Sequence, residues 1–260
     1  MSEKYQETAY VICQEEIGTD IYGMWIKTEN IAAKAVPGQF VSLYSADGSR
    51  ILPRPISICE LNNEKTALRL VYRIAGKGTE EFSNLKSENV IKVTGPLGNG
   101  YTMKDNRAML VAGGIGVPPM VELAKELKRK GLNDIKAVIG YRNNEMFLKG
   151  ELEKYCQVYV ATEDGSYGVK GNVIDAIKEY NLEADTIYSC GPKPMLKAVA
   201  SYAEGKGIEA QISLEERMAC GIGACLGCVC KSKEKDAHSN VNNKRVCVDG
   251  PVFDSREVEL

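Results

Sequence analysis

The sequence predicts a multidomain β + α/β chain: an antiparallel β-barrel, then a Rossmann-like parallel sheet, then a small cysteine-rich C-terminal domain. Three observations predict this order. Short β-type runs separated by turn residues fill about the first hundred positions, apolar runs alternate with helical patterns in the middle, and five of the nine cysteines lie near the C-terminal end. A chain of 260 residues has room for three compact units. We place them at residues 1–101, 102–210 and 211–260.

Composition and charge exclude several classes of protein. The net charge of −2 and the scattered lysines give no basic patch, so we expect neither a nucleic-acid partner nor a membrane partner. The N-terminal residues are polar and lack the apolar core of a signal peptide. The longest uncharged run, Ala108 to Val121, is too short for a membrane span and is interrupted by glycine and proline. These features predict a cytoplasmic protein.

The barrel is predicted from evenly spaced β-type segments in the N-terminal region. Clear examples are Ile21–Ile26, Gln39–Tyr44, Ala67–Tyr72 and Val90–Val93, each bounded by turn residues. Even spacing with alternating apolar and polar positions is typical of an antiparallel barrel and not of βαβ units.

Two polar stretches within this region are candidates for ligand binding. Arg54-Pro-Ile-Ser57 is expected to end a polar turn, with a guanidinium suited to a bidentate diphosphate contact and a hydroxyl three residues later. The run from Val71 to Thr79 leads from a strand through glycines into a helix that we expect to begin near Thr79, which is the arrangement of an anion site. Taken singly, each is also consistent with an ordinary turn or loop-to-helix junction.

The middle region begins with a nucleotide-binding pattern. Ala108–Ala112 is an apolar run without alternation, as expected of a parallel strand buried on both faces. A glycine turn and a helix over Met120–Lys130 follow, so backbone N–H groups face a dinucleotide pyrophosphate. The turn reads G-x-G-x-x-P, with Gly114, Gly116 and Pro119 at its three fixed positions; proline is tolerated in the first helical turn.

Further strand–helix units extend the predicted sheet. Strands are expected at Ile135–Gly140, Gln157–Ala161 and Thr186–Cys190, and the last precedes Gly191-Pro192 and a helix. Parallel sheets of this kind bind ligand at the carboxyl ends of their strands. On the residues alone, a buried core thiol at the end of a strand is the favoured interpretation of Cys190.

The choice between NAD and NADP stays open at this point. Glu163 and Asp164 follow one strand and would repel a 2′-phosphate, whereas Arg142 follows another and would attract one.

The cysteine-rich segment contains a metal-binding pattern. Cys220, Cys225 and Cys228 are spaced C-x4-C-x2-C, and Cys247 follows beyond a polar loop, which is the ligand spacing of plant-type [2Fe–2S] proteins. Small residues between the cysteines let the backbone curl around a cluster and direct N–H groups at its sulfurs.

Other interpretations of the cysteines are less consistent with the pattern. A structural zinc site more often has two short knuckles, and only one is present. A Rieske centre needs two histidines, whereas the chain has only His238, in a stretch from Lys231 to Arg245 that we expect to be an exposed hairpin or loop. A disulfide framework suits a small secreted domain. Cys230 is interpreted as a small buried side chain.

The two polar stretches of the barrel resemble the paired flavin motifs of the ferredoxin–NADP reductase superfamily. The resemblance rests on Arg54-Pro-Ile-Ser57 and Gly76-Lys-Gly-Thr79. It implies FAD contacts at Arg54, Pro55, Ile56, Ser57, Val71, Tyr72, Arg73, Gly78 and Thr79. One departure is Ile56, where many members have a stacking tyrosine, so Tyr72 or another residue is expected to cover the flavin ring.

The segment Cys190-Gly-Pro-Lys-Pro-Met195 resembles the part of that superfamily placed beside the nicotinamide. It implies a catalytic position for Cys190 near the site of hydride transfer. The NAD contacts expected on this basis are Gly114, Gly116, Pro119, Cys190, Gly191 and Pro192.

Nearly the whole chain resembles the electron-transfer subunit of bacterial class 1B dihydroorotate dehydrogenase, most specifically over Glu216–Lys231. The resemblance implies an oxidoreductase subunit with Cys220, Cys225, Cys228 and Cys247 as cluster ligands. It also implies an FMN-containing catalytic partner in a heterotetramer of two subunits of each kind. Electrons would pass from that FMN through the cluster and FAD to NAD⁺ in pyrimidine biosynthesis.

Two alternatives remain from the sequence. One is the equivalent FAD/[2Fe–2S] subunit of an NAD(P)H-dependent ferredoxin- or sulfide-linked oxidoreductase. The other is a zinc-binding adaptor that uses a degenerate reductase fold.

Overall fold

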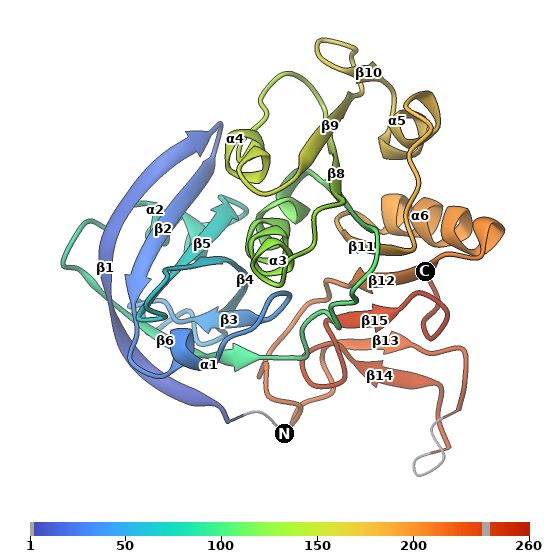
Figure 1. Ribbon diagram of the computed structural model, residues 1–260. Helices are drawn as coiled ribbons and strands as arrows, with labels where there is room; N and C mark the ends of the chain where they lie inside the picture. Colours follow the sequence, from blue (N-terminus) through green and yellow to red (C-terminus); the bar gives the residue numbers. More distant parts are fainter. Residues whose placement is uncertain (1–2, 236–239) are drawn as a thin grey trace.

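The computed structural model describes residues 3–235 and 240–260. Its β-strands form a closed barrel, a seven-stranded sheet and a two-stranded hairpin. The barrel lies beside the sheet, and the hairpin lies below the sheet (Figure 1). None of the helices in the described ranges combines the length and apolar character that a membrane crossing requires. His238 lies outside the described residues.

The barrel confirms the antiparallel architecture that the sequence predicted. Its strands follow the order β1–β2–β5–β4–β3–β6 around the wall. They are β1 (Tyr5–Gly18), β2 (Ile21–Lys27), β3 (Phe40–Leu43), β4 (Arg54–Leu61), β5 (Ala67–Arg73) and β6 (Val90–Leu97), with α1 (Ile31–Lys34) and α2 (Lys77–Ser83) in the connections. The long strand β1 gives a weak sequence signal because only one of its faces, through Ala9 and Val11, is buried in the barrel.

The structure corrects the expected turn at Arg54-Pro-Ile-Ser57. These four residues open strand β4, and they pair with β3 in the register Ser42↔Pro55 and Phe40↔Ser57. Proline is tolerated there because it stands near the start of the strand, where one missing N–H donor costs the ladder little. The motif is therefore held by the barrel wall.

The parallel sheet has the order β10–β9–β8–β7–β11–β12–β15. Its strands are β7 (Ala108–Gly113), β8 (Ile135–Tyr141), β9 (Gln157–Thr162), β10 (Val169–Lys170), β11 (Thr186–Cys190), β12 (Glu209–Ser213) and β15 (Val252–Asp254). The helices between them are η1 (Gly114–Gly116), α3 (Pro118–Arg129), α4 (Lys149–Glu153), α5 (Val173–Glu179) and α6 (Lys193–Lys206). All neighbours pair in parallel except β15, which runs antiparallel to β12.

The C-terminal unit is joined to the rest of the molecule. Its hairpin is formed by β13 (Val229–Lys231) and β14 (Asn243–Arg245), and its last strand, β15, extends the sheet. The expected boundary between residues 210 and 211 falls inside β12. We propose that the cluster-binding unit begins after Ser213, where the sheet strand ends.

The barrel and the sheet share a hydrophobic core. Ile21, Cys59 and Val71 on the outer face of the barrel pack into the same cluster as the residues of β7 and α3. A carboxylate lies within this contact: Glu122 on α3, which is almost fully buried, accepts a hydrogen bond from the Leu61 N–H of β4 at 2.8 Å. This bond joins the strand that begins with Arg54 to the helix that follows the glycine turn.

Replacing Glu122 with glutamine is expected to stabilise the protein at alkaline pH. Burial raises the pKa of Glu122 from 4.5 to about 7, although the Leu61 N–H and Lys125 act in the opposite direction. A carboxyl group whose pKa is raised by folding contributes its full stabilisation at pH values below its pKa in the unfolded chain. This contribution is lost as the pH rises through about 7, the pKa in the folded protein. Raising the pKa by one unit corresponds to about 1.36 kcal/mol, so the stability lost by ionising Glu122 amounts to about 3 kcal/mol above pH 8.

The measurement is the melting temperature of the wild type and of Glu122→Gln at pH 5 and pH 8. We expect the two proteins to converge at pH 5 and the variant to melt higher at pH 8. Glu126→Gln is the matched control, because Glu126 lies one helical turn further and its Arg129 contact lowers its pKa. Equal differences at both pH values would contradict the assignment.

Candidate functional site

The two flavin motifs, which are separated in sequence, meet in the structure. A Cβ atom on Gly78 would lie 2.3 Å from Nε of Arg54, so the guanidinium lies directly against the first turn of α2. Only glycine leaves this space open, because any side chain there would displace the arginine. The contact places a cation beside the start of α2, where the sequence predicts a diphosphate.

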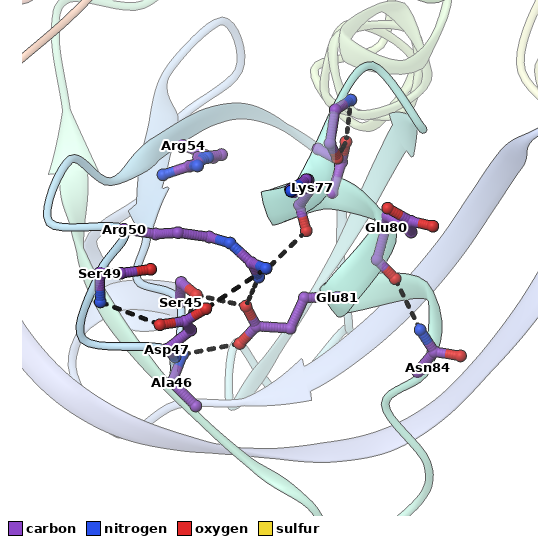
Figure 2. Close-up of polar contacts among 12 residues, drawn as sticks. Ser45, Ala46, Asp47, Ser49, Arg50, Arg54, Lys77, Glu80, Glu81 and Asn84 are labelled. Atoms are coloured by element: carbon purple, nitrogen blue, oxygen red, sulfur yellow. Dashed lines mark hydrogen bonds and ion pairs between the residues drawn. The ribbon is translucent and has the colours of Figure 1, made fainter.

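The loop before Arg54 is anchored to α2 by a second arginine (Figure 2). Arg50 pairs with Glu81 at 2.6 Å and with Asp47 at 3.3 Å. Glu81 also accepts hydrogen bonds from the Ser45 hydroxyl and, at 2.7 Å, from the Ala46 N–H. Burial acts to raise the pKa of Glu81, but these contacts outweigh it and hold the pKa below its ordinary value.

This anchoring leaves Arg54 available for an anion. Within the described residues, the hydrogen bond recorded for its guanidinium goes to the Leu52 carbonyl oxygen, and no carboxylate pairs with it. The turn before α2 is fixed as well, because the Thr79 hydroxyl accepts the Ala75 and Gly76 N–H groups at 2.8 and 3.2 Å. Helix α2 begins at Lys77, slightly earlier than predicted. These residues fit a flavin diphosphate.

The side chain of Tyr72 does not cover a flavin ring. It is buried inside the barrel, stacked on Tyr22 with ring centroids 6.1 Å apart and edge-on to Phe82 at 6.3 Å. Its hydroxyl donates to Oε1 of Gln14 at 2.7 Å. The expectation for this side chain was wrong because β5 alternates, so that Tyr72 points into the core while Val71 packs on the outer face.

A cavity of about 920 Å³ lies where the barrel meets the carboxyl end of the sheet. Four of the expected NAD contacts line it, namely Gly114, Gly116, Gly191 and Pro192. They face Arg73 from the end of β5, one of the expected FAD contacts. The structure therefore brings parts of the predicted flavin and nucleotide sets to one cavity, as parallel-sheet topology requires.

Cys190 and Pro119 lie behind the cavity wall. Cys190 is 1% exposed, and a Cβ on Gly116 would come within 2.3 Å of its carbonyl oxygen. Burial raises the pKa of the Cys190 thiol, so the group is uncharged at neutral pH. Pro119 is buried in the first turn of α3. Both residues shape the loops that line the cavity, and neither is among its lining residues.

Glu215 is a cavity residue that the sequence analysis missed. It follows β12, so it stands at the carboxyl end of a sheet strand, a position that could have drawn attention to it. Glu215 is exposed as a residue, while the protein around its carboxylate desolvates the group and raises its pKa. Arg142 and Glu163, whose charges favour opposite cofactors, also line the cavity, whereas Asp164 does not.

The four expected cluster ligands are arranged as two pairs. The Cys225 side chain lies close enough to Cys220 to lower its pKa, and the Cys228 side chain lies close enough to Cys247 to raise its pKa. Among the described residues, no three metal-binding side chains are placed closely enough to hold a single ion. A [2Fe–2S] cluster has two irons that share four cysteine thiolates, so two pairs suit its composition.

Backbone N–H groups are already directed at these sulfurs. Ala224 donates to Sγ of Cys220 at 3.3 Å, Gly227 to Cys225 at 3.4 Å, and Cys247 to Cys228 at 3.4 Å. Burial acts to raise the pKa of Cys220, but hydrogen bonds from nearby N–H groups and from the Cys225 thiol lower it to about 6. Cys220 thus favours the thiolate, which is the form that binds iron, whereas burial raises the pKa of Cys247 to about 12.

Two further features support this segment as a cluster site. Gly223 has φ of +90°, and a Cβ there would lie 2.5 Å from Val248, so the curl of the loop depends on glycine. Cys230 is buried in β13, as the sequence analysis expected, and its pKa is raised by burial. The fifth cysteine is therefore interpreted as a packing residue.

Comparison with known proteins agrees with these sites. Residues 215–259 match the iron–sulfur cluster binding domain of dihydroorotate dehydrogenase B, and residues 110–201 match an oxidoreductase NAD-binding domain. A dihydroorotate dehydrogenase B (NAD(+)) electron transfer subunit from Fusobacterium nucleatum is 46% identical, with 94% of this chain and 95% of that protein aligned. The chain belongs to this family of electron transfer subunits.

Other relatives in the family are similar along their whole length. The subunits from Streptococcus pneumoniae and Bacillus velezensis are 42% and 43% identical, with 98% and 94% of this chain aligned to 98% and 95% of theirs. The recognition made from the sequence is therefore confirmed, as are the barrel, the NAD-binding sheet and the C-terminal cluster domain.

Solved structures extend the comparison to three dimensions. An NADH-dependent reduced ferredoxin–NADP oxidoreductase studied for electron bifurcation superposes with a TM-score of 0.87 at 29% identity, covering 97% of this chain and 90% of that one. An Amycolatopsis cytochrome P450 reductase shares the fold, with a TM-score of 0.68 at 20% identity, over 79% of this chain and 67% of the other. The chain is an oxidoreductase component whose cofactors are FAD, a [2Fe–2S] cluster and NAD.

Proposed function

We propose that this chain receives electrons from an FMN-containing catalytic subunit that oxidises dihydroorotate, and delivers them to NAD⁺. One observation carries the proposal: the cluster segment packs against both other units. Cys228 and Cys247 share a core with Phe40 and Leu97 of the barrel and with Ile212 of the sheet. When bound, FAD supplies both one-electron exchange with a cluster and hydride exchange with a nicotinamide.

The residues of the chain have distinct roles in this proposal. Arg54, Gly78 and Thr79 hold the flavin diphosphate, and Ser57 faces the ring from the start of β4. The glycine turn before α3 and the Gly191-Pro192 turn bind NAD in the shared cavity, while Cys190 supports the wall behind them. Four more of the expected FAD contacts, Pro55, Ile56, Val71 and Arg73, border these positions, as does Pro119 for NAD. Tyr72 stays in the set only through its backbone, because its side chain lies in the barrel core.

The surface beside Cys225 supports a protein partner at the cluster. Cys225 is exposed, and the neighbouring apolar side chains Ile222 and Leu226 are 49% and 63% exposed. Exposed apolar residues beside a redox ligand suit a partner that covers them and excludes water. We propose that the partner is the catalytic subunit, in a cytoplasmic heterotetramer of two chains of each kind.

The deciding experiment is an anaerobic assay of the chain purified with its catalytic partner. We expect dihydroorotate to reduce NAD⁺ in the complex, and NADH alone to reduce the flavin in the isolated chain. Dihydroorotate should leave the isolated chain oxidised, because its site lies on the partner. Flavin reduction by NADH without any response of the complex to dihydroorotate would contradict the proposed partner.

The similarity to an NADH-dependent reduced ferredoxin–NADP oxidoreductase supports one second candidate. It is the equivalent FAD/[2Fe–2S] subunit of a ferredoxin- or sulfide-linked oxidoreductase. The same purified chain distinguishes the two, because reduction of NAD⁺ by reduced ferredoxin in place of dihydroorotate would favour this candidate.

A further inference from the structure

Ser42 has a buried hydroxyl without a partner on the face of the barrel that meets the cluster unit. The residue is 2% exposed, and within the described part of the chain its Oγ atom makes no hydrogen bond. A buried hydroxyl that makes no hydrogen bond is costly, so native proteins seldom keep one without a reason.

The geometry of β3 directs this hydroxyl away from the barrel core. Val41 and Leu43 point into the barrel, so Ser42 between them points outward. Phe40, which shares that outer face, packs in the same cluster as Cys228 and Cys247. The outer face of β3 is therefore covered by the cluster-binding unit.

The residue that Ser42 meets there is next to a cluster ligand. A Cβ on Gly221 would lie 3.0 Å from Oγ of Ser42, and Gly221 directly follows Cys220. Gly221 has φ of +67°, a conformation that glycine adopts without strain, so the chain turns at this point of contact. The unpartnered donor thus lies at the Cys220 end of the predicted cluster.

We propose that the Ser42 hydroxyl donates a hydrogen bond to the sulfur shell of the [2Fe–2S] cluster at its Cys220 ligand and thereby raises the cluster's reduction potential. The inference rests on the proposed function only in requiring that the cluster be present. Reduction adds negative charge, and a donor directed at the sulfurs stabilises the reduced form. A residue of the flavin barrel would in this way tune the neighbouring redox centre.

The test is a redox titration of the cluster, followed by electron paramagnetic resonance, in the purified cluster-loaded chain. Ser42→Ala should lower the cluster's midpoint potential, by about 59 mV for a tenfold change in a one-electron equilibrium. Ser42→Thr retains the hydroxyl and should therefore have the midpoint potential of the wild type. The flavin potential should not change in either variant.

Thr94→Val is the matched control. Thr94 pairs directly with Ser42 across the β3–β6 ladder, but its hydroxyl already has partners, accepting from Nε2 of Gln6 at 3.1 Å and donating to the Tyr44 hydroxyl at 3.4 Å. Removing it should leave the cluster potential unchanged. A second readout is the melting temperature in a Cys225→Ser background, where Ser42→Ala should be neutral or stabilising because no cluster is present to accept the bond.

Three results would overturn the inference. An unchanged reduction potential of the cluster in Ser42→Ala would show that the hydroxyl makes no hydrogen bond to the cluster. A shift of the flavin potential alone would show that the hydroxyl acts on the flavin instead. Absence of a [2Fe–2S] signal in the wild-type chain would refute the inference and the proposed function together. The first two results leave the proposed function intact, so the two failures are distinguishable.

Discussion

Replacing Cys225 with serine is expected to eliminate the [2Fe–2S] cluster while the flavin barrel still folds. The Cys225 side chain lies beside Cys220 and lowers its pKa, so the loss of Cys225 breaks one of the two ligand pairs. Substituting a residue that only supports a metal ligand already lowers metal affinity or activity by about 10–100-fold. We therefore expect dihydroorotate-dependent reduction of NAD⁺ by the complex to fall by at least about 100-fold.

The measurements are iron content, the reduced-cluster paramagnetic resonance signal and flavin content of the purified variant. Cys230→Ser is the matched control, because Cys230 belongs to the same segment and is buried in β13 among packing residues. It should retain iron and signal. A normal reduced-cluster signal in Cys225→Ser would remove Cys225 from the ligand set. Reduction of the flavin by NADH should survive in both variants, since it does not involve the cluster.

Replacing Arg54 with alanine is expected to cause the second large effect, a loss of FAD. The guanidinium lies against Gly78 at the start of α2, and no carboxylate among the described residues pairs with it. Hydrogen bonds to charged groups contribute about 1.5–3 kcal/mol. Their loss corresponds to a roughly 10- to 150-fold increase in the dissociation constant for FAD.

The dissociation constant is measured by the quenching of flavin fluorescence as FAD is added to the flavin-free protein. Arg54→Lys should fall between the wild type and alanine, because lysine keeps the charge but loses the planar fork of donors. Arg129→Ala serves as a control for loss of an arginine elsewhere, since Arg129 is paired with Glu126 on the outer part of α3. Unchanged FAD affinity in Arg54→Ala would exclude Arg54 from the diphosphate site.

Much of the candidate site could be predicted from local sequence. The spacing of Cys220, Cys225 and Cys228 was sufficient to indicate a cluster. The apolar run Ala108–Ala112 with its glycine turn indicated a nucleotide-binding strand, and the structure has β7 at that position. Such patterns are readable because a few consecutive residues share one strand, turn or loop, whose geometry follows from their own backbone preferences.

Predictions that required knowing a distant neighbour were incomplete or wrong. Tyr72 was expected to cover a ring, but the pairing of β5 with its neighbours turns its side chain into the barrel. Glu215 was missed although it follows a sheet strand, and Ser42 gave no signal in the sequence, because the role of each depends on the residues that surround it.

The sequence by itself determined the family, the order of the three units, and the cysteines and glycines available for cofactors. Only the tertiary structure decided that Arg54 lies on Gly78, that β15 completes the sheet of the NAD-binding domain, and that Glu122 joins that domain to the barrel. The physical reason is that local spacing restricts nearby backbone directly, whereas contacts between distant segments depend on how whole strands and helices bury their apolar faces together.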